Sequence, residues 1–207
     1  MDDIAHRVTT LAELQALYGD ANPPSLLKEV DHITPHYRAF IEAAPFVALA
    51  SAGPDGFDCS PRGDAPGFVR VADERTVLIP DRRGNNRIDT LRNIIADPRI
   101  ALLFLIPGIG ETMRINGRAA ISRDPALCDS FAVDGKAPRT VLVVAVERVY
   151  FQCAKAIVRA KLWDPATQIS RSALPSTGTM LAALSRGAMD AEEYDRAYPE
   201  RLRQTIY

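Results

Sequence analysis

Residues 112–122 read Thr-Met-Arg-Ile-Asn-Gly-Arg-Ala-Ala-Ile-Ser and carry the clearest secondary-structure signal in the chain. Apolar or small residues occupy the odd positions, and polar residues occupy all the even positions except 120. This period of two is typical of a β-strand with one buried face, because successive side chains of a strand point to opposite sides. The preceding apolar run, residues 100–106, predicts a strand that is buried on both faces.

Short apolar runs separated by Gly, Pro and Asp extend this pattern along the chain in both directions. Gly53-Pro54-Asp55-Gly56 and Ala72-Asp73-Glu74-Arg75 are the expected turns of two hairpins. One helix is expected to interrupt the strands, beginning near Asn85 or Asn86 and ending before Pro98. The fold class that follows is mainly β (α+β), with about six strands in a small antiparallel barrel and flanking helices. Extended segments are also expected over 46–52, 57–60, 68–71, 76–79, 141–146 and 149–152.

Helical segments are expected on either side of the strands. Thr10 and Glu13 have the spacing of a capping box, and Thr34 followed by Pro35 is typical of a second helix start. A short helix is expected over 124–131, and the end of the chain is expected to be helical or irregular. We therefore expect one domain over 1–207, with a helical N-terminal extension (1–44), a barrel core (45–165) and a helical C-terminal tail (166–207).

The composition is that of an ordinary globular protein, because 47% of the 207 residues are hydrophobic and 25% are charged. Lys and Arg total 25 against 26 Asp and Glu, so no overall positive field exists to hold nucleic acid or an anionic membrane. The longest apolar run, 100–107, is far shorter than the roughly 20 residues of a membrane span. Met1, Asp2 and Asp3 lack the basic start of a secretion signal, so we expect a cytoplasmic protein.

Metal sites and side-chain catalysts find little support in the sequence. His6, His32 and His36 all lie in the helical extension, and Pro35 interrupts the spacing that would suit zinc. No Cys-x-x-Cys, Gly-x-Ser-x-Gly or Gly-x-Gly-x-x-Gly motif occurs, and Cys59 has no neighbouring base. We therefore expect no metal, and we expect a phosphorylated cofactor to carry out the chemistry.

The densest candidate for an anion site is Asp81-Arg82-Arg83-Gly84-Asn85-Asn86-Arg87, just before the expected helix. Free backbone N–H groups and the positive end of the helix dipole favour an anion at such a position, and the arginines add to that preference. The alternative is a solvated loop in which Asn86 caps the helix. The spacing alone leaves both interpretations open.

Three further groups of residues could contact a ligand, and each has a plainer alternative. One lies at a strand end in Ser-Pro-Arg-Gly-Asp and could be part of a β-turn. Another lies on the polar face of strand 112–122 and could simply be solvated. The last lies on a helical turn beyond the strands, where the single tryptophan could pack in a core or an interface. These groups are Ser60 with Arg62, Thr112 with Arg114, and Lys155 with Arg159 and Trp163.

Five segments form an ordered series along the chain: Ser60-Pro61-Arg62-Gly63-Asp64, 79–87, 103–108, 111–117 and 153–163. This series resembles the FMN-binding proteins of the pyridoxamine 5′-phosphate oxidase-like family, and it is closest to a bacterial branch of that family. The resemblance covers roughly residues 40–165, and the series is more specific than any one segment. It implies a six-stranded antiparallel split β-barrel that forms a homodimer and binds two FMN molecules in grooves at the subunit interface.

The family resemblance also implies which side chains contact the cofactor. The implied contacts are Ser60 and Arg62 with the phosphate and ribityl chain, Pro80 and Asp81 beside the isoalloxazine ring, Asn86 and Arg87 with the phosphate, Thr112 and Arg114 flanking the ring, and Lys155, Arg159 and Trp163 approaching from the second subunit.

The function that the resemblance implies is that of an FMN-dependent oxidoreductase, in which hydride moves through flavin N5 to or from an unknown small molecule. A non-catalytic flavin-binding or flavin-storage protein is one alternative, and a barrel without a cofactor is another. Two departures argue against oxidation of pyridoxamine 5′-phosphate itself. The vitamin-synthesising oxidases have Arg-Lys where this chain has Asn86-Arg87, and they end in Trp…Arg-x-His where this chain has 201–207.

Overall fold

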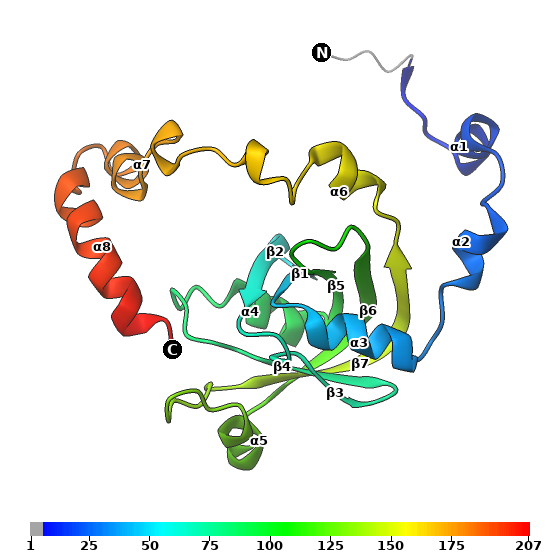
Figure 1. Ribbon diagram of the computed structural model, residues 1–207, viewed down its shortest axis with the longest axis horizontal. Coiled ribbons are helices and arrows are strands. Elements are labelled where there is room, and N and C mark those ends of the chain that lie inside the picture. The colour runs from blue at the N-terminus through cyan, green and yellow to red at the C-terminus, as the bar shows by residue number, and fades with distance from the viewer. Residues whose placement is uncertain (1–5) are drawn as a thin grey trace.

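Seven antiparallel strands form one sheet in the computed structural model, which describes residues 6–207 (Figure 1). The acidic start of the chain, which argues against a secretion signal, falls mainly in residues 1–5 and so lies outside the described range. The strands are β1 (Phe46–Gly53), β2 (Gly56–Gly63), β3 (Arg70–Asp73), β4 (Thr76–Pro80), β5 (Arg99–Leu105), β6 (Thr112–Ser122) and β7 (Val141–Gln152). The helices are α1 (Leu11–Tyr18), α2 (Pro23–Leu27), α3 (Pro35–Ala43), α4 (Asp89–Ala96), α5 (Pro125–Ser130), α6 (Lys155–Ala160), α7 (Thr177–Leu184) and α8 (Ala191–Thr205), with short 3₁₀ turns at Pro165–Thr167 and Arg171–Ala173.

The antiparallel α+β class is confirmed, but the expected count of six strands is not the count observed. The strand order is β2-β1-β5-β6-β7-β4-β3, and the edge strands β2 and β3 do not pair with each other within residues 6–207, so the sheet is not closed. We call this open sheet, together with α3 and α4, which contact it, the barrel. The two strands expected over 141–152 are the single strand β7. A bulge opposite Asn116 and Gly117 takes up an extra residue of β7 and lets its ladder with β6 continue.

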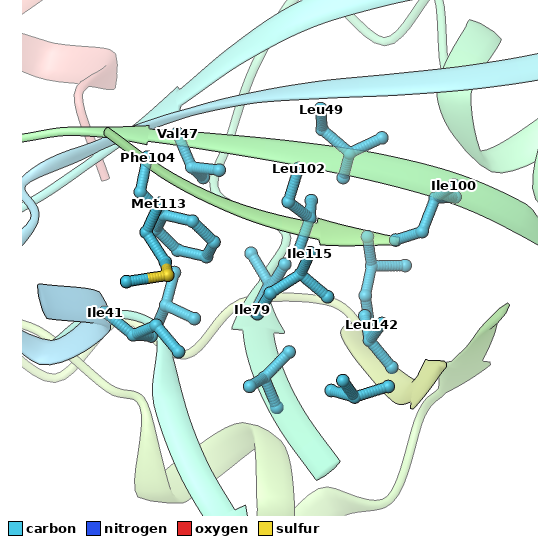
Figure 2. Close-up of a cluster of buried hydrophobic side chains, with 14 of the residues drawn as sticks. Ile41, Val47, Leu49, Ile79, Ile100, Leu102, Phe104, Met113, Ile115 and Leu142 are labelled. Carbon is cyan, nitrogen blue, oxygen red and sulfur yellow. The ribbon is translucent and has the colours of Figure 1, made fainter. Parts of the chain in front are cut away.

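The core lies on one face of the sheet, where alternate residues are buried. Met113 and Ile115 are 1% and 0% exposed, and Figure 2 shows them among the packed side chains together with Ile41 of α3. The alternation expected for β6 is therefore confirmed. Strand β5 differs from the expectation, because Leu102 is buried while Leu103 is 37% exposed. Only one face of β5 is covered within this chain, as is common in antiparallel sheets.

Local sequence signals set the starts of the first and third helices. The Thr10 side chain accepts a hydrogen bond from the backbone N–H of Glu13, and the Glu13 carboxylate accepts one from the backbone N–H of Thr10. Thr34 caps α3 in the same way, by accepting from the backbone N–H of Tyr37. Both expected helix starts are confirmed. The local sequence is enough to predict them because the capping hydrogen bonds join residues only three positions apart.

Helix α4 begins at Asp89, later than the expected start near Asn85 or Asn86. Asn86 and Ile88 have φ angles of 59° and 54°, in the left-handed region. A β-branched residue such as Ile88 rarely adopts this conformation. Ile88 occupies the N-cap position and provides no side-chain hydrogen bond there. Residues 81–88 are therefore an irregular segment, which we call the arginine-rich loop, and Asn86 does not cap the helix.

Both ends of the chain extend away from the sheet. Figure 1 shows α1 and α2 standing apart from the strands, while α6, α7 and α8 form an arc whose last residues return to the barrel. None of the side chains of α1, α2, α6 or α8 is buried, and Leu11, Leu27 and Leu184 are 80–83% exposed. The division into extension, core and tail stays a prediction. Within residues 6–207, no helix is both long and apolar enough to cross a bilayer.

Gly117→Ala is expected to destabilise the sheet by about 2 kcal/mol, in the range of other overpacking substitutions. A Cβ atom at Gly117 would lie 2.2 Å from the backbone oxygen of Ala145, so β6 and β7 would have to move apart at the bulge. The measurement is urea unfolding of the two proteins. Gly84→Ala is the matched control, because a Cβ atom there meets nothing within 4 Å. Equal losses in the two variants would contradict the prediction.

Candidate functional site

A groove of about 1170 Å³ lies beside the edge strand β2. Its walls come from the end of β2, the arginine-rich loop, the first turn of α4, the loop at 136–140 and the last two residues of the chain. Six of the side chains singled out in the sequence line this groove. They are Ser60, Arg62, Pro80, Asp81, Asn86 and Arg87.

A hydrogen-bonded cluster forms the inner part of the groove. The alternation of β2 places Asp58, Ser60 and Arg62 on the same side of the strand, toward Thr90 of α4. Arg62 Nη1 donates to Ser60 Oγ at 2.8 Å, and its Nη2 donates to Thr90 Oγ1 at 3.1 Å. The Thr90 hydroxyl, on a residue only 4% exposed, donates in turn to the Asp58 carboxylate. The Arg62 guanidinium is therefore fixed in position before any ligand arrives.

Asp81 lies next to this cluster, at the end of β4. Its Oδ1 is 4.0 Å from Arg62 Nε. Burial raises the pKa of Asp81, and the cations of Arg62 and Arg139 only partly oppose that effect. Just before β7, the backbone oxygen of Thr140 accepts from the Asp81 backbone N–H at 3.0 Å, while the buried Thr140 Oγ1 has no hydrogen-bond partner within residues 6–207. The groove thus contains a carboxyl group that holds its proton at higher pH than usual and a hydroxyl group with free hydrogen-bonding capacity.

Arg82 has a structural role, although in the sequence it stands among the arginines of the candidate anion site. Its Nε donates to Asp64 Oδ2 at 2.7 Å, and its Nη1 donates to the backbone oxygen of Phe131 at 2.7 Å. The two charged side chains of this ion pair are 15% and 4% exposed. Arg82 therefore ties the arginine-rich loop to the barrel, and its charge is matched by Asp64.

The outer part of the groove is more exposed and more positive. Arg87 is exposed, and its Nε donates to Asp89 Oδ2 at 2.8 Å. Six basic and four acidic side chains line the groove as a whole. Three of the six basic side chains make no ion pair within the described part of the chain: Arg83, Lys136 and Arg139. An anionic ligand is the species that this excess of positive charge suits.

The other side chains singled out in the sequence lie outside this groove within a single chain. Arg114 Nη1 lies 3.4 Å from Gln152 Oε1 and donates to it, and Trp163 Nε1 donates to the backbone oxygen of Ile109 at 2.8 Å. These contacts place Arg114 on the sheet and fix the start of the C-terminal arc. The complete set outside the groove is Thr112, Arg114, Lys155, Arg159 and Trp163.

Several groove residues were not found by sequence reasoning. Asp58 could have been found from the sequence, because residues two apart in a strand lie on the same face and Asp58 is two residues before Ser60 in β2. Thr90, Thr140 and Tyr207 carry no such signal, because they reach the groove through tertiary contacts. No group of three or more histidine, cysteine or carboxylate side chains placed to hold a metal ion occurs among the described residues.

A comparison with models of known protein families shows which family this chain belongs to. A family model described as Pyridoxamine 5′-phosphate oxidase matches residues 33–153. The chain belongs to the pyridoxamine 5′-phosphate oxidase family. The match spans all seven strands and α4, so the groove beside β2 lies almost entirely within the family's part of the chain.

A comparison with solved structures finds similar chains at low sequence identity, with TM-scores below 0.5. HupZ from Group A Streptococcus is 20% identical, with a TM-score of 0.47, over 58% of this chain and 99% of that one. A putative pyridoxamine 5′-phosphate oxidase from Lactobacillus delbrueckii is 18% identical, with a TM-score of 0.46, over 58% and 95% of the two chains. A protein from Mesorhizobium loti described as FAD-binding is 14% identical, with a TM-score of 0.39, over 58% and 94%. A comparison with curated protein sequences found no match.

Proposed function

We propose that the chain binds FMN in the groove beside β2 and acts as an FMN-dependent oxidoreductase on a small molecule. The observation that carries this proposal is the Arg62 guanidinium, held in position by the hydroxyl oxygens of Ser60 and Thr90, in a chain of the pyridoxamine 5′-phosphate oxidase family. A planar guanidinium is well suited to a phosphate, because it donates two parallel charge-assisted hydrogen bonds.

The charges of the groove fit a phosphate dianion. Arg62 is held by neutral hydroxyl groups, and the raised pKa of its nearest carboxyl, Asp81, weakens the competition for its positive charge. Arg87 and Asn86 lie on the outer side, where Arg87 is free to turn from Asp89 toward a ligand because both side chains are exposed. Binding to a donor set that is already in place costs little ordering of side chains.

The chain's own residues would orient the cofactor and handle protons. The redox chemistry, hydride transfer at flavin N5, comes from the cofactor when it is bound. Asp81 is the side chain positioned to hold and release a proton in the groove, because burial favours its neutral form. Pro80 ends β4 just before Asp81 and restricts the backbone at that point.

We also propose that a second copy of the chain completes the site, as a homodimer in the cytoplasm. The exposed face of the sheet supports this, because Leu103 lies directly between Ala48 and Arg114 on neighbouring strands, and Phe46 and Leu103 are 39% and 37% exposed. Apolar side chains on the outside of a sheet suit burial against a partner. In the dimer, Lys155, Arg159 and Trp163 would approach the cofactor from the other subunit, and Thr112 and Arg114 would flank its ring.

The test of the proposed function is the visible spectrum of the purified protein and its titration with FMN. Retention of a yellow cofactor, or saturable binding of added FMN, is the expected result. A protein that remains colourless and does not titrate would overturn the proposal. Reduction of the bound flavin by NADH or NADPH, followed by reoxidation with an acceptor such as a quinone, distinguishes an oxidoreductase from a flavin-storage protein.

Arg87→Ala is expected to weaken FMN binding about tenfold while leaving riboflavin binding nearly unchanged. Riboflavin lacks the phosphate group, so a side chain that contacts only the phosphate affects FMN alone. Both affinities are measured by fluorescence titration. Arg92→Ala is the matched control, because Arg92 is an exposed arginine of α4 that does not line the groove. An equal loss for both flavins would contradict the assigned role of Arg87.

A further inference from the structure

The residues that follow α8 reach into the groove from the far end of the chain. Tyr207 Oη donates to Asp64 Oδ1 at 2.7 Å, across a separation of 143 residues. The guanidinium carbon of Arg82 lies 5.4 Å from the centre of the Tyr207 ring. Ile206 and Tyr207 both line the groove, and Figure 1 shows the C-terminal end of α8 beside the barrel. The family match ends at residue 153, so this wall of the groove comes from outside the family's part of the chain.

The Asp64 carboxylate that Tyr207 contacts is held in position by other hydrogen bonds. The Asp64 carboxylate also accepts from the backbone N–H of Ala65 at 2.8 Å and from Arg82 Nε at 2.7 Å. Arg82 is held on its other side by the backbone oxygen of Phe131. The phenol of Tyr207 therefore meets an anion whose position is set by the barrel, and a hydrogen bond to an ionised acceptor is stronger than one between neutral groups.

The segment that carries Tyr207 makes little other contact with the barrel. Helices α7 and α8 pack on each other, and the backbone N–H of Gly178 donates to Asp195 Oδ1 at 2.8 Å. Trp163 fixes the start of the arc through its hydrogen bond to Ile109. No side chain of α8 is buried, so its placement beside the groove depends strongly on what its last residues contact.

We propose that Tyr207 is a cofactor-retaining residue: its contact with Asp64 and Arg82 closes one end of the groove over bound FMN, and release of that contact opens the groove for exchange. The inference rests on the proposed FMN site. It adds to that site a binding residue that the resemblance to the family does not include.

The test compares FMN release from the wild-type protein and from two variants. Tyr207→Phe removes only the hydroxyl group, and Tyr207→Ala also removes the ring over Arg82. The FMN dissociation rate after dilution is expected to rise about tenfold in Tyr207→Ala and by a smaller factor in Tyr207→Phe. Tyr18→Phe and Tyr18→Ala are the matched controls, because Tyr18 is 81% exposed on α1. Unchanged release from Tyr207→Ala would overturn the proposal.

A second measurement, made without FMN, keeps this result separate from the proposed function. Trypsin cleaves after Arg201 and Arg203, in the last turns of α8, and the Tyr207 contact is expected to slow that cleavage. Cleavage should be several times faster in both Tyr207 variants than in the wild type or the Tyr18 variants. Faster cleavage with unchanged FMN release would show that the segment docks without retaining the cofactor, which overturns the inference and leaves the proposed function standing. Failure of the wild-type protein to bind FMN at all would overturn both.

Discussion

Arg62→Ala should weaken FMN binding about a hundredfold, the largest loss expected from any single substitution in the groove. Arg62 is the central donor of the cluster, since two of its nitrogens are held by Ser60 and Thr90. The variant removes both the positive charge and the planar fork that would meet the phosphate. It also leaves Asp81 without its nearest cation, which is 4.0 Å away. The measurement is the FMN dissociation constant by fluorescence titration.

Two further variants control this result. Arg62→Lys keeps the charge but loses the two-pronged geometry, so its loss should fall between those of the wild type and Arg62→Ala. Arg118→Ala removes an exposed arginine of β6 that does not line the groove, and its FMN affinity should be unchanged. If Arg62→Ala binds FMN as tightly as Arg118→Ala does, the phosphate does not lie at this cluster.

Asp64→Asn should lower the free energy of unfolding by about 3 kcal/mol at pH 7, because it leaves the Arg82 guanidinium without a counter-charge. Both partners are largely buried, with side chains 15% and 4% exposed, so water cannot replace the lost carboxylate. Burial raises the pKa of Asp64, but the hydrogen bonds from Tyr207, Ala65 and Arg82 outweigh it and leave the pKa below its ordinary value.

The pH dependence of this effect has a definite sign. A carboxyl group whose pKa is lowered by folding contributes stability above its unfolded pKa, about 3.9, and that contribution is lost as the pH falls through the folded value. The difference between the wild type and Asp64→Asn should therefore be full at pH 7 and should shrink as the pH falls below about 4. Urea unfolding at a series of pH values measures it.

Asp81→Asn is the matched comparison, because the pKa of Asp81 is shifted in the opposite direction. A carboxyl group whose pKa is raised by burial stabilises the fold when protonated, and this stability is lost as the pH rises through the folded value. Asp81→Asn should then be at least as stable as the wild type at pH 7 and should lose that advantage in acid. Destabilisation of both variants by the same amount at pH 7 would contradict the distinct environments of the two carboxyl groups.

The parts of the fold that depend on neighbouring residues could be predicted from the sequence. The caps at Thr10 and Thr34 involve partners three residues away, and the alternation of β6 reports its own buried face. The start of α4 could not be predicted, because Asn86 and Ile88 adopt left-handed conformations that helix-start statistics do not anticipate. The exposure of Leu103 was likewise missed, since an apolar run does not say what covers its second face.

The candidate site also contains residues that the sequence could predict and residues that it could not. Ser60 and Arg62 could be named as candidates because a hydroxyl group and a guanidinium stand at the end of a strand, and both residues line the groove. The different uses of the loop arginines could not be named, because the sequence does not show that Arg82 pairs with a carboxylate 18 residues away while Arg87 stays exposed. Tyr207 could not be predicted from the sequence, because it reaches Asp64, 143 residues away, only through the fold of the C-terminal arc.

The position of the strands along the chain also affects the order of events during synthesis. All seven strands lie within residues 46–152, and the arc of α6 to α8 follows them. Chains fold from the N-terminal side as they leave the ribosome. The barrel, the arginine-rich loop and the cluster around Arg62 can therefore assemble while the residues that close the groove are still being made. A newly made barrel would meet its flavin through an open entrance, and the tyrosine that narrows that entrance would dock afterwards.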